Sequence, residues 1–246
     1  MIKTDLTISN LNHYIYCPIY YKHTINNNIY SKRTLINNGT RQLFAWCFYE
    51  LTTGTKKLKL QDIENKAYKD LFPDVYSESD MSKYPSDILK LIDKINNKSG
   101  DYDIIAPSIY YPFAVSGILV SCPIDLIINS KNKSHCSFFI LDFNDKYTIN
   151  ATQNLYMPSI VIPYNVIPTY FTMPRKQIKI YSAKLSSSKL SKATEQTSGQ
   201  LIFKDIESIV SSIKSNNYYR RVSANCENCV FNKQCFTSNG DSINDN

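Results

Sequence analysis

The chain has 246 residues, enough for one large domain or for a main domain with a small appended one. Its 28 Lys and Arg exceed its 21 Asp and Glu, and the net charge of +7 permits nucleic-acid binding without establishing it. Hydrophobic residues make up 43% and charged residues 20%, which excludes a wholly disordered chain, and no apolar run approaches the roughly 20 residues of a membrane helix.

The first third of the chain is predicted to be helical. Ser9 is placed to cap a helix that runs toward Tyr21, and Pro18 is expected to end or kink that helix early. Further amphipathic helices are predicted at residues 41–51, 61–72 and 86–97. Loops are predicted at residues 72–74 and 81–85, which contain prolines.

The middle of the chain changes to short apolar segments rich in β-branched residues. Strands are predicted at residues 116–120, 124–129, 138–143 and 178–181. Residues 182–200 are rich in Ser, Lys and Thr, which predicts an exposed loop or a flexible connection. A well-patterned helix follows at residues 202–213.

These patterns divide the chain into four regions. They are an N-terminal helical region (1–100), an α/β core (101–200), a C-terminal helix with a cysteine cluster (201–236) and a disordered tail (237–246). The predicted fold class is α/β, with a small mixed sheet flanked by helices and a lobe formed by both ends of the chain.

The cysteines give the sharpest local signal. Cys226, Cys229 and Cys235 have the spacing C-x2-C-x5-C, in which the first pair can aim both sulfurs at one metal and the third closes the site. Three ligands leave tetrahedral coordination one short, and Cys17 is the natural fourth. Zinc and an iron–sulfur cluster both satisfy four thiolates. The odd count of seven, with residues 1–5 lacking an apolar signal region, favours a reducing, intracellular compartment.

Two aspartates lie on predicted neighbouring strands. Asp125 is embedded in an apolar strand, where an ionised carboxylate needs a cation or another partner, and Asp142 lies near the end of the next strand. Such a pair can hold Mg²⁺ or Mn²⁺ and activate water. The alternative is that each Asp caps a strand or a turn. A downstream Gln153-x-x-Tyr156 favours the catalytic interpretation.

The order of these motifs resembles that of the RecB-type PD-(D/E)XK nucleases that carry an iron–sulfur cluster. The motifs are, in chain order, Cys17, Gly117 to Asp125, Asp142, Gln153 and the three C-terminal cysteines. This group includes the CRISPR-associated exonuclease and eukaryotic exonuclease V, and the resemblance spans residues 9–236. It implies a restriction-endonuclease-like core and a [4Fe–4S] cluster on the four cysteines. It also implies a divalent metal on Asp125 and Asp142, with an assisting Lys and Gln153.

The resemblance is incomplete around the predicted active site. The expected Lys falls on Asn144, so that Lys146 would have to serve instead, and residues 39–43 lack the family's His. The chain is therefore expected to be a metal-dependent DNA nuclease, single-strand or end-directed, in repair, recombination, replication or CRISPR adaptation. Alternatively, it is a catalytically inactive nuclease-fold subunit that binds nucleic acid or a protein complex.

The resemblance also sets the expected partners and location. Single-stranded DNA and proteins of a repair, replication or CRISPR complex are the expected partners, with no membrane. The expected location is the cytoplasm or nucleoid, or the host cell for a virus-encoded protein. Phosphate contacts and base stacking are predicted for Arg220, Arg221, Tyr218 and Tyr219, with ordinary surface packing as the alternative. Replacing Asp125 by Ala is expected to abolish cleavage and to leave folding intact.

Overall fold

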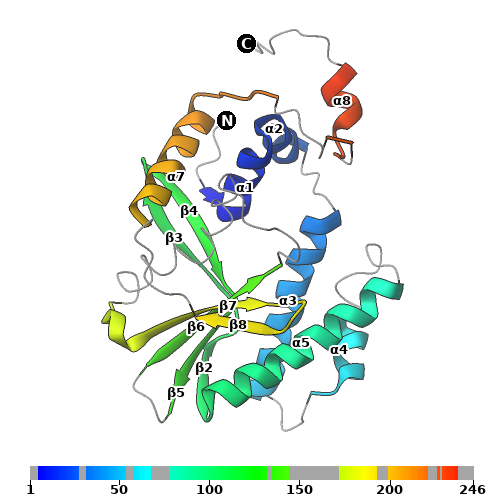
Figure 1. The fold of residues 1–246 in the computed structure, drawn as a ribbon, viewed down its shortest axis with the longest axis vertical. Helices are drawn as coiled ribbons and strands as arrows, with labels where there is room; N and C mark the ends of the chain where they lie inside the picture. Colours follow the sequence, from blue (N-terminus) through cyan, green and yellow to red (C-terminus); the bar gives the residue numbers. More distant parts are fainter. Residues whose placement is uncertain are drawn as a thin grey trace.

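The chain folds as a mixed α/β protein in which two mixed sheets are flanked by helices (Figure 1). The computed structural model describes residues 5–27, 32–53, 58–67, 78–131, 135–143, 172–192, 199–220, 226–227 and 229–237. Within these residues no helix is long and apolar enough to cross a membrane.

Helices dominate the first hundred residues and return at the C-terminus. The early helices are α1 (Ile8–Tyr16), α2 (Pro18–Asn27), α3 (Lys32–Thr53), α4 (Leu60–Lys66) and α5 (Glu78–Ser99). The later ones are the 3-10 helix η3 (Arg175–Gln177), α7 (Gly199–Lys214) and α8 (Asn232–Thr237).

The strands form two separate sheets. The three-stranded sheet has the order β1-β4-β3 and contains β1 (Asp5–Thr7), β3 (Ile109–Val115) and β4 (Ile118–Ile124). The five-stranded sheet has the order β2-β5-β6-β7-β8 and contains β2 (Tyr102–Ala106), β5 (Leu126–Ser130), β6 (Cys136–Asp142), β7 (Ile178–Lys184) and β8 (Lys189–Lys192). The pairs β1–β4 and β6–β7 are parallel, and the others are antiparallel.

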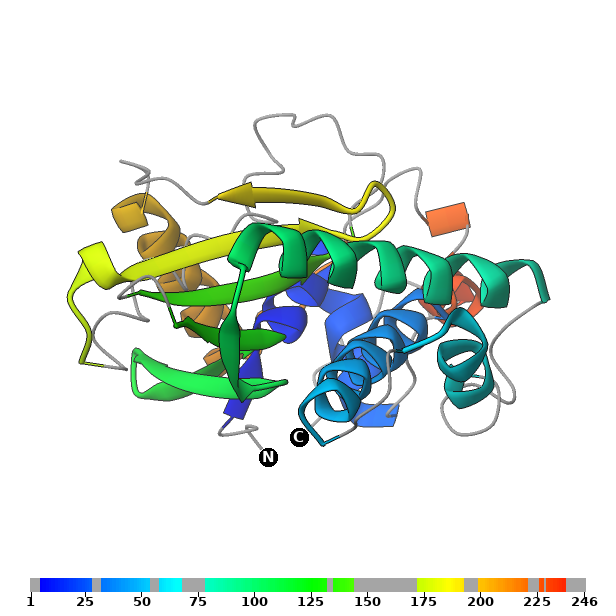
Figure 2. The same ribbon diagram turned by 90° about the horizontal axis from the view of Figure 1, so that it is seen from below.

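Two hydrophobic cores lie on opposite faces of the five-stranded sheet. One contains side chains of α1, α7 and the three-stranded sheet, and the other contains side chains of α3, α4 and α5. Strand β6 contributes side chains to both cores because successive side chains of a strand point to opposite faces of the sheet. Phe138 and Ile140 enter the first core, whereas Phe139 and Leu141 enter the second. Figure 2 shows α3 and α5 lying together on one flank of the sheets.

The N-terminal helices confirm the prediction for Pro18 and correct the predicted cap. Helix α1 ends at Tyr16 and Pro18 opens α2, where its missing N–H is tolerated. The cap is Thr7, not Ser9. Thr7 Oγ1 accepts the backbone N–H of Asn10 at 3.1 Å, and Asn10 Oδ1 accepts the N–H of Thr7 at 2.9 Å.

The predicted loop at residues 81–85 is wrong, because these residues belong to α5, with Pro85 inside the helix. Farther along, the helix buries Ile88, Leu91 and Ile95 completely, and this packing outweighs the hydrogen bond that proline cannot make. The predicted loop at 182–200 instead contains the end of β7 and all of β8. Strands β1, β2 and β3 were not predicted at these positions.

Candidate functional site

Asp125 is the single residue between β4 and β5, where the chain passes from one sheet to the other. Its backbone N–H donates to the carbonyl of Phe139 at 2.9 Å. Its carboxylate Oδ2 accepts the backbone N–H of Leu141 at 2.7 Å. Because β5 pairs with β6 only from Leu126 onward, this carboxylate satisfies a backbone group that has no strand neighbour there.

Arg41 of α3 supplies the cation for this buried carboxylate. Its guanidinium forms an ion pair with Asp125, and a second N–H donates to the carbonyl of Leu141 at 3.1 Å. The guanidinium also lies 5.1 Å from the ring centroid of Phe143. The Arg41 side chain is 17% exposed and that of Asp125 is 2% exposed, so the pair is largely removed from water.

A neutral pair of side chains lies beside this ion pair. Burial raises the pKa of the Cys122 thiol to about 12, and Cys122 is in register with Tyr111 of β3. Burial likewise raises the pKa of Tyr111 well above its ordinary value. Cys122 is therefore a protonated core side chain, as expected for a cysteine outside the predicted metal site.

The structure places only part of the predicted acidic site. Asp142 is the last residue of β6 and is in register with Lys184 of β7, and its backbone follows directly after Leu141. Lys146, Gln153 and Asn144 lie outside the described residues. The Asp125 carboxylate therefore adjoins the residue before Asp142, and the predicted pairing of the two carboxylates stays a prediction.

Asp125 is not arranged as a ligand of a divalent metal. Its carboxylate already binds the Arg41 guanidinium and the N–H of Leu141. Across the described part of the chain, no three His, Cys, Asp or Glu side chains are grouped to hold a metal ion. A metal would have to displace a buried guanidinium, so these residues do not fit the predicted Mg²⁺ or Mn²⁺.

The predicted cysteine site joins the two ends of the chain. Cys17 lies in the break between α1 and α2, Cys226 and Cys229 lie in a short turn, and Cys235 lies in α8. The N–H of Cys229 donates to the carbonyl of Cys226 at 3.2 Å, and the Asn232 side chain donates to the same carbonyl at 2.6 Å. The turn is therefore held by its own backbone and by one amide side chain.

Phe231 attaches this turn to the N-terminal helices. Its ring is 2% exposed and lies 5.4 Å from Tyr20 and 5.0 Å from His23, both on α2. Helix α2 begins immediately after Cys17, so this contact brings the C-terminal cysteines toward Cys17. In Figure 1, α8 lies beside α2 although about 200 residues separate them in the chain.

The four predicted cysteine ligands differ from the other cysteines in exposure. Cys17, Cys226, Cys229 and Cys235 are partly exposed, whereas Cys47, Cys122 and Cys136 are buried. Burial raises the pKa of the Cys229 thiol, and Cys17, Cys226 and Cys235 make smaller contributions in the same direction. Among the described residues no three His, Cys, Asp or Glu side chains are grouped to hold a metal ion, so the four sulfurs do not form a preformed metal site. Four thiols are the donor set that a zinc ion or an iron–sulfur cluster takes.

The predicted nucleic-acid residues divide into two groups. Tyr218 packs in an aromatic cluster, 6.3 Å from Tyr14 and 6.2 Å from Tyr21, with Lys22 Nζ 5.7 Å from its ring centroid. Tyr219 is 46% exposed, which keeps part of its ring available to a ligand. Arg220 donates a hydrogen bond to the carbonyl of Cys235. Arg221 lies outside the described residues.

Sequence reasoning missed Arg41 and Phe231. Arg41 was noted only as part of a stretch without histidine, and no spacing rule links it to a residue 84 positions away. Phe231 lies between two of the predicted cysteine ligands, and its apolar ring in a polar stretch was the one available signal.

Comparison with known proteins gives a limited result. No protein-family model matches the chain, and no curated protein sequence matches it significantly. Among solved structures, the crystal structure of SSO0001 is similar, with 12% identity and a TM-score of 0.43, over 95% of this chain and 86% of that one. At that TM-score the likeness assigns no function to the chain.

The Arg41–Asp125 pair is expected to be strongly coupled. Arg41→Met or Asp125→Asn alone leaves a buried partner unsatisfied and should lower the free energy of unfolding by about 3–5 kcal/mol. The double variant should lose clearly less than the sum of the two single losses, as measured by urea unfolding. The exposed pair of Lys131 and Asp103, 3.2 Å apart, is the matched control, with a coupling of at most about 1 kcal/mol. Strictly additive losses for Arg41 and Asp125 would contradict the coupling.

The protein should become less stable as the pH is lowered, because of the buried side chain of His13. This residue lies one helical turn before Cys17. Burial lowers the pKa of His13 from 6.5 to about 4. The unfolded chain therefore takes up a proton below pH 6.5 that the folded chain refuses until about pH 4, which destabilises the fold by up to about 3 kcal/mol across that window. In urea unfolding at pH 7 and pH 5, His13→Phe should lose less stability than the wild type. This variant keeps an aromatic ring against Tyr20, and parallel losses in the two proteins would rule out the assignment.

Proposed function

We propose that the chain is a catalytically inactive nuclease-fold protein that binds nucleic acid, as a subunit of a DNA-processing complex. The observation that carries this proposal is the ion pair between Arg41 and Asp125. The carboxylate that would hold the catalytic metal is bound instead by a guanidinium of the same chain. Because the pair is buried, replacing Arg41 by a metal would leave a charged group without a partner in the interior.

The sequence around the site also departs from the nuclease pattern, which favours an inactive protein. Asn144 stands where the nuclease pattern has a Lys, and residues 39–43 lack its His. Arg41 lies in that second stretch, so a basic residue that contacts Asp125 occurs where the pattern has an imidazole. A restriction-endonuclease-like core accords with the five-stranded mixed sheet and with Asp125 and Asp142 on neighbouring strands.

Nucleic acid is the proposed ligand because positive charge is concentrated in one part of the chain. Residues 172–220 contain nine Lys or Arg and three Asp or Glu, which accounts for most of the net charge of +7. Such a concentration attracts phosphate backbones over distances of about 10 Å at 0.1 M salt.

Metal-dependent DNA cleavage is the second candidate function. The favouring observation is one of position, because Asp125 adjoins Leu141, the residue directly before Asp142. Cleavage would require a metal to displace the Arg41 guanidinium from the Asp125 carboxylate.

We further propose that Cys17, Cys226, Cys229 and Cys235 hold a [4Fe–4S] cluster, with Zn²⁺ as the alternative. Support comes from the donor chemistry of four partly exposed thiols and from the packing of Phe231 on α2, which brings the C-terminal cysteines toward Cys17. The group would supply a rigid link between the ends of the chain, beside the contact that Phe231 already makes.

Binding without cleavage is the expected result for the full-length protein. With Mn²⁺ present, labelled single-stranded DNA should shift in fluorescence anisotropy and should remain intact on a denaturing gel. Asp142→Asn should leave the binding unchanged. Asp142 is a better probe than Asp125, since replacing Asp125 by Ala removes the partner of Arg41 and, contrary to expectation from sequence, is predicted to impair folding. Mn²⁺-dependent cleavage that Asp142→Asn abolishes would replace this proposal by the second candidate.

Anaerobic purification is expected to yield a brown protein that absorbs near ~400 nm. Cys229→Ser should lose this colour, because one thiolate ligand is removed. Cys47→Ala is the matched control and should keep it, since burial raises the pKa of Cys47 to about 12 and the residue belongs to the helical core. Colourless protein with stoichiometric zinc would select the zinc alternative, and metal-free protein would contradict a four-thiolate site.

A further inference from the structure

Helix α5 carries a row of lysines on its solvent side. Lys83, Lys90, Lys94 and Lys98 are all exposed, while the opposite face of the helix enters the hydrophobic core. With 3.6 residues per turn, the four lysines fall within about 80° of one another around the helix axis. They therefore form one continuous stripe.

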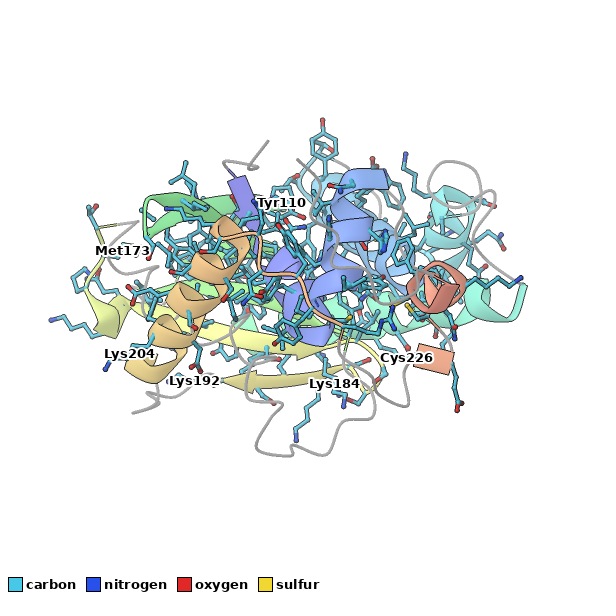
Figure 3. All side chains as sticks on the ribbon, turned by 90° about the horizontal axis from the view of Figure 1, so that it is seen from above. Tyr110, Met173, Lys184, Lys192, Lys204 and Cys226 are labelled. Carbon is cyan, nitrogen blue, oxygen red and sulfur yellow. The ribbon has the colours of Figure 1, made fainter. Side chains whose placement is uncertain are left out.

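This stripe continues onto the edge of the five-stranded sheet. Lys98 Nζ lies 4.7 Å from the ring centroid of Tyr181 in β7, and Tyr181 is in register with Lys192 of β8. Figure 2 shows α5 running alongside this hairpin, and helix α5 contacts β8 directly. Figure 3 labels Lys192 and Lys184 at opposite ends of the hairpin. Lys184 and Lys189 are in register and alternate with Ala183 and Leu190, which enter the core under α5, so this pair belongs to the opposite face of the sheet.

Few acidic residues lie along the lysines of α5. Glu78 and Asp80 open the helix before Lys83, and the rest of it contains Asp87, which is buried, and Asp93, which is exposed at the side of the stripe. Residues 172–192, which include both strands of the hairpin, contain no Asp or Glu. Lys192 and the four lysines of α5 thus combine into one positive field.

We infer that this lysine track, made of Lys83, Lys90, Lys94, Lys98 and Lys192, binds the phosphate backbone of single-stranded nucleic acid. Lysines four residues apart are separated by about 6 Å along the helix, so each can reach a different phosphate. The track turns from a helix onto a sheet edge. A flexible single strand follows such a path, whereas a duplex resists bending over its persistence length of about 150 base pairs. This inference rests on the proposed function, because it locates the nucleic acid which that function requires.

The test compares two charge-matched triple variants of the full-length protein. K90Q/K94Q/K98Q removes three lysines of the track, and K131Q/K214Q/K233Q removes three exposed lysines from the turn after β5, from α7 and from α8. Affinity for fluorescein-labelled oligothymidine is measured by anisotropy across a salt series. The track variant should bind at least about tenfold more weakly and should lower the slope of log K against log salt by about 2, since each single-strand contact contributes about 0.7. The control variant should stay near wild type.

Each other outcome overturns the inference in a distinguishable way. Equal weakening in both triple variants would mean that net charge alone matters, and an unaffected track variant would place the ligand elsewhere. In both cases the proposed function stands. Tighter binding of a duplex of equal length would refute the single-strand assignment. Wild-type protein that binds no nucleic acid would remove the inference and the proposed function together. K192Q, on the sheet edge, should also weaken binding, which keeps the test decisive should the helix variant misfold, whereas K189Q, on the other face of the sheet, should not.

Discussion

The buried ion pair between Arg41 and Asp125 connects three parts of the molecule at one point. Arg41 belongs to the helical layer, Asp125 joins the two sheets, and both side chains bind the backbone of Leu141 in β6. The chain changes sheets within a single residue, so the backbone there lacks a strand neighbour. The carboxylate and the guanidinium satisfy the N–H and the carbonyl of Leu141, which explains why a charged pair is retained in the interior.

This use of Asp125 also limits the chemistry of the site. A carboxylate that is neutralised by a fixed guanidinium cannot also bind a divalent metal without breaking the contacts that close the fold. The structural and catalytic roles of this residue therefore compete. In the structure, both contacts of the Asp125 carboxylate are structural.

The C-terminal cysteines are attached by a different kind of contact. Phe231 packs between Tyr20 and His23, and Tyr218 packs against Tyr14 and Tyr21. These rings join the two ends of the chain through apolar and aromatic contacts that need no metal. A cluster on the four thiolates would thus stabilise a closure that the rings have already formed, in contrast to small metal domains that fold only with their metal.

Local sequence patterns predicted the elements whose signals are long or strongly periodic. The α/β class, the α3, α5 and α7 regions, strands β4 to β7 and the break at Pro18 could all be read from apolar spacing and proline chemistry. The four-cysteine site stays a prediction, because no three His, Cys, Asp or Glu side chains are grouped to hold a metal among the described residues. Strand β1 was not, because three residues carry no periodicity and depend on pairing with β4. The extension of α5 through Pro85 depended on core packing, which local propensity cannot supply.

The sequence by itself thus determined the fold class, the order of most elements and which residues could carry chemistry. Only the tertiary structure decided what neutralises Asp125, what attaches the cysteine turn to α2, and that the lysines of α5 continue onto β8. The physical reason is that each of these contacts joins residues more than 80 positions apart in the chain. Such contacts are selected by packing and electrostatics in the folded state, and no local pattern encodes them.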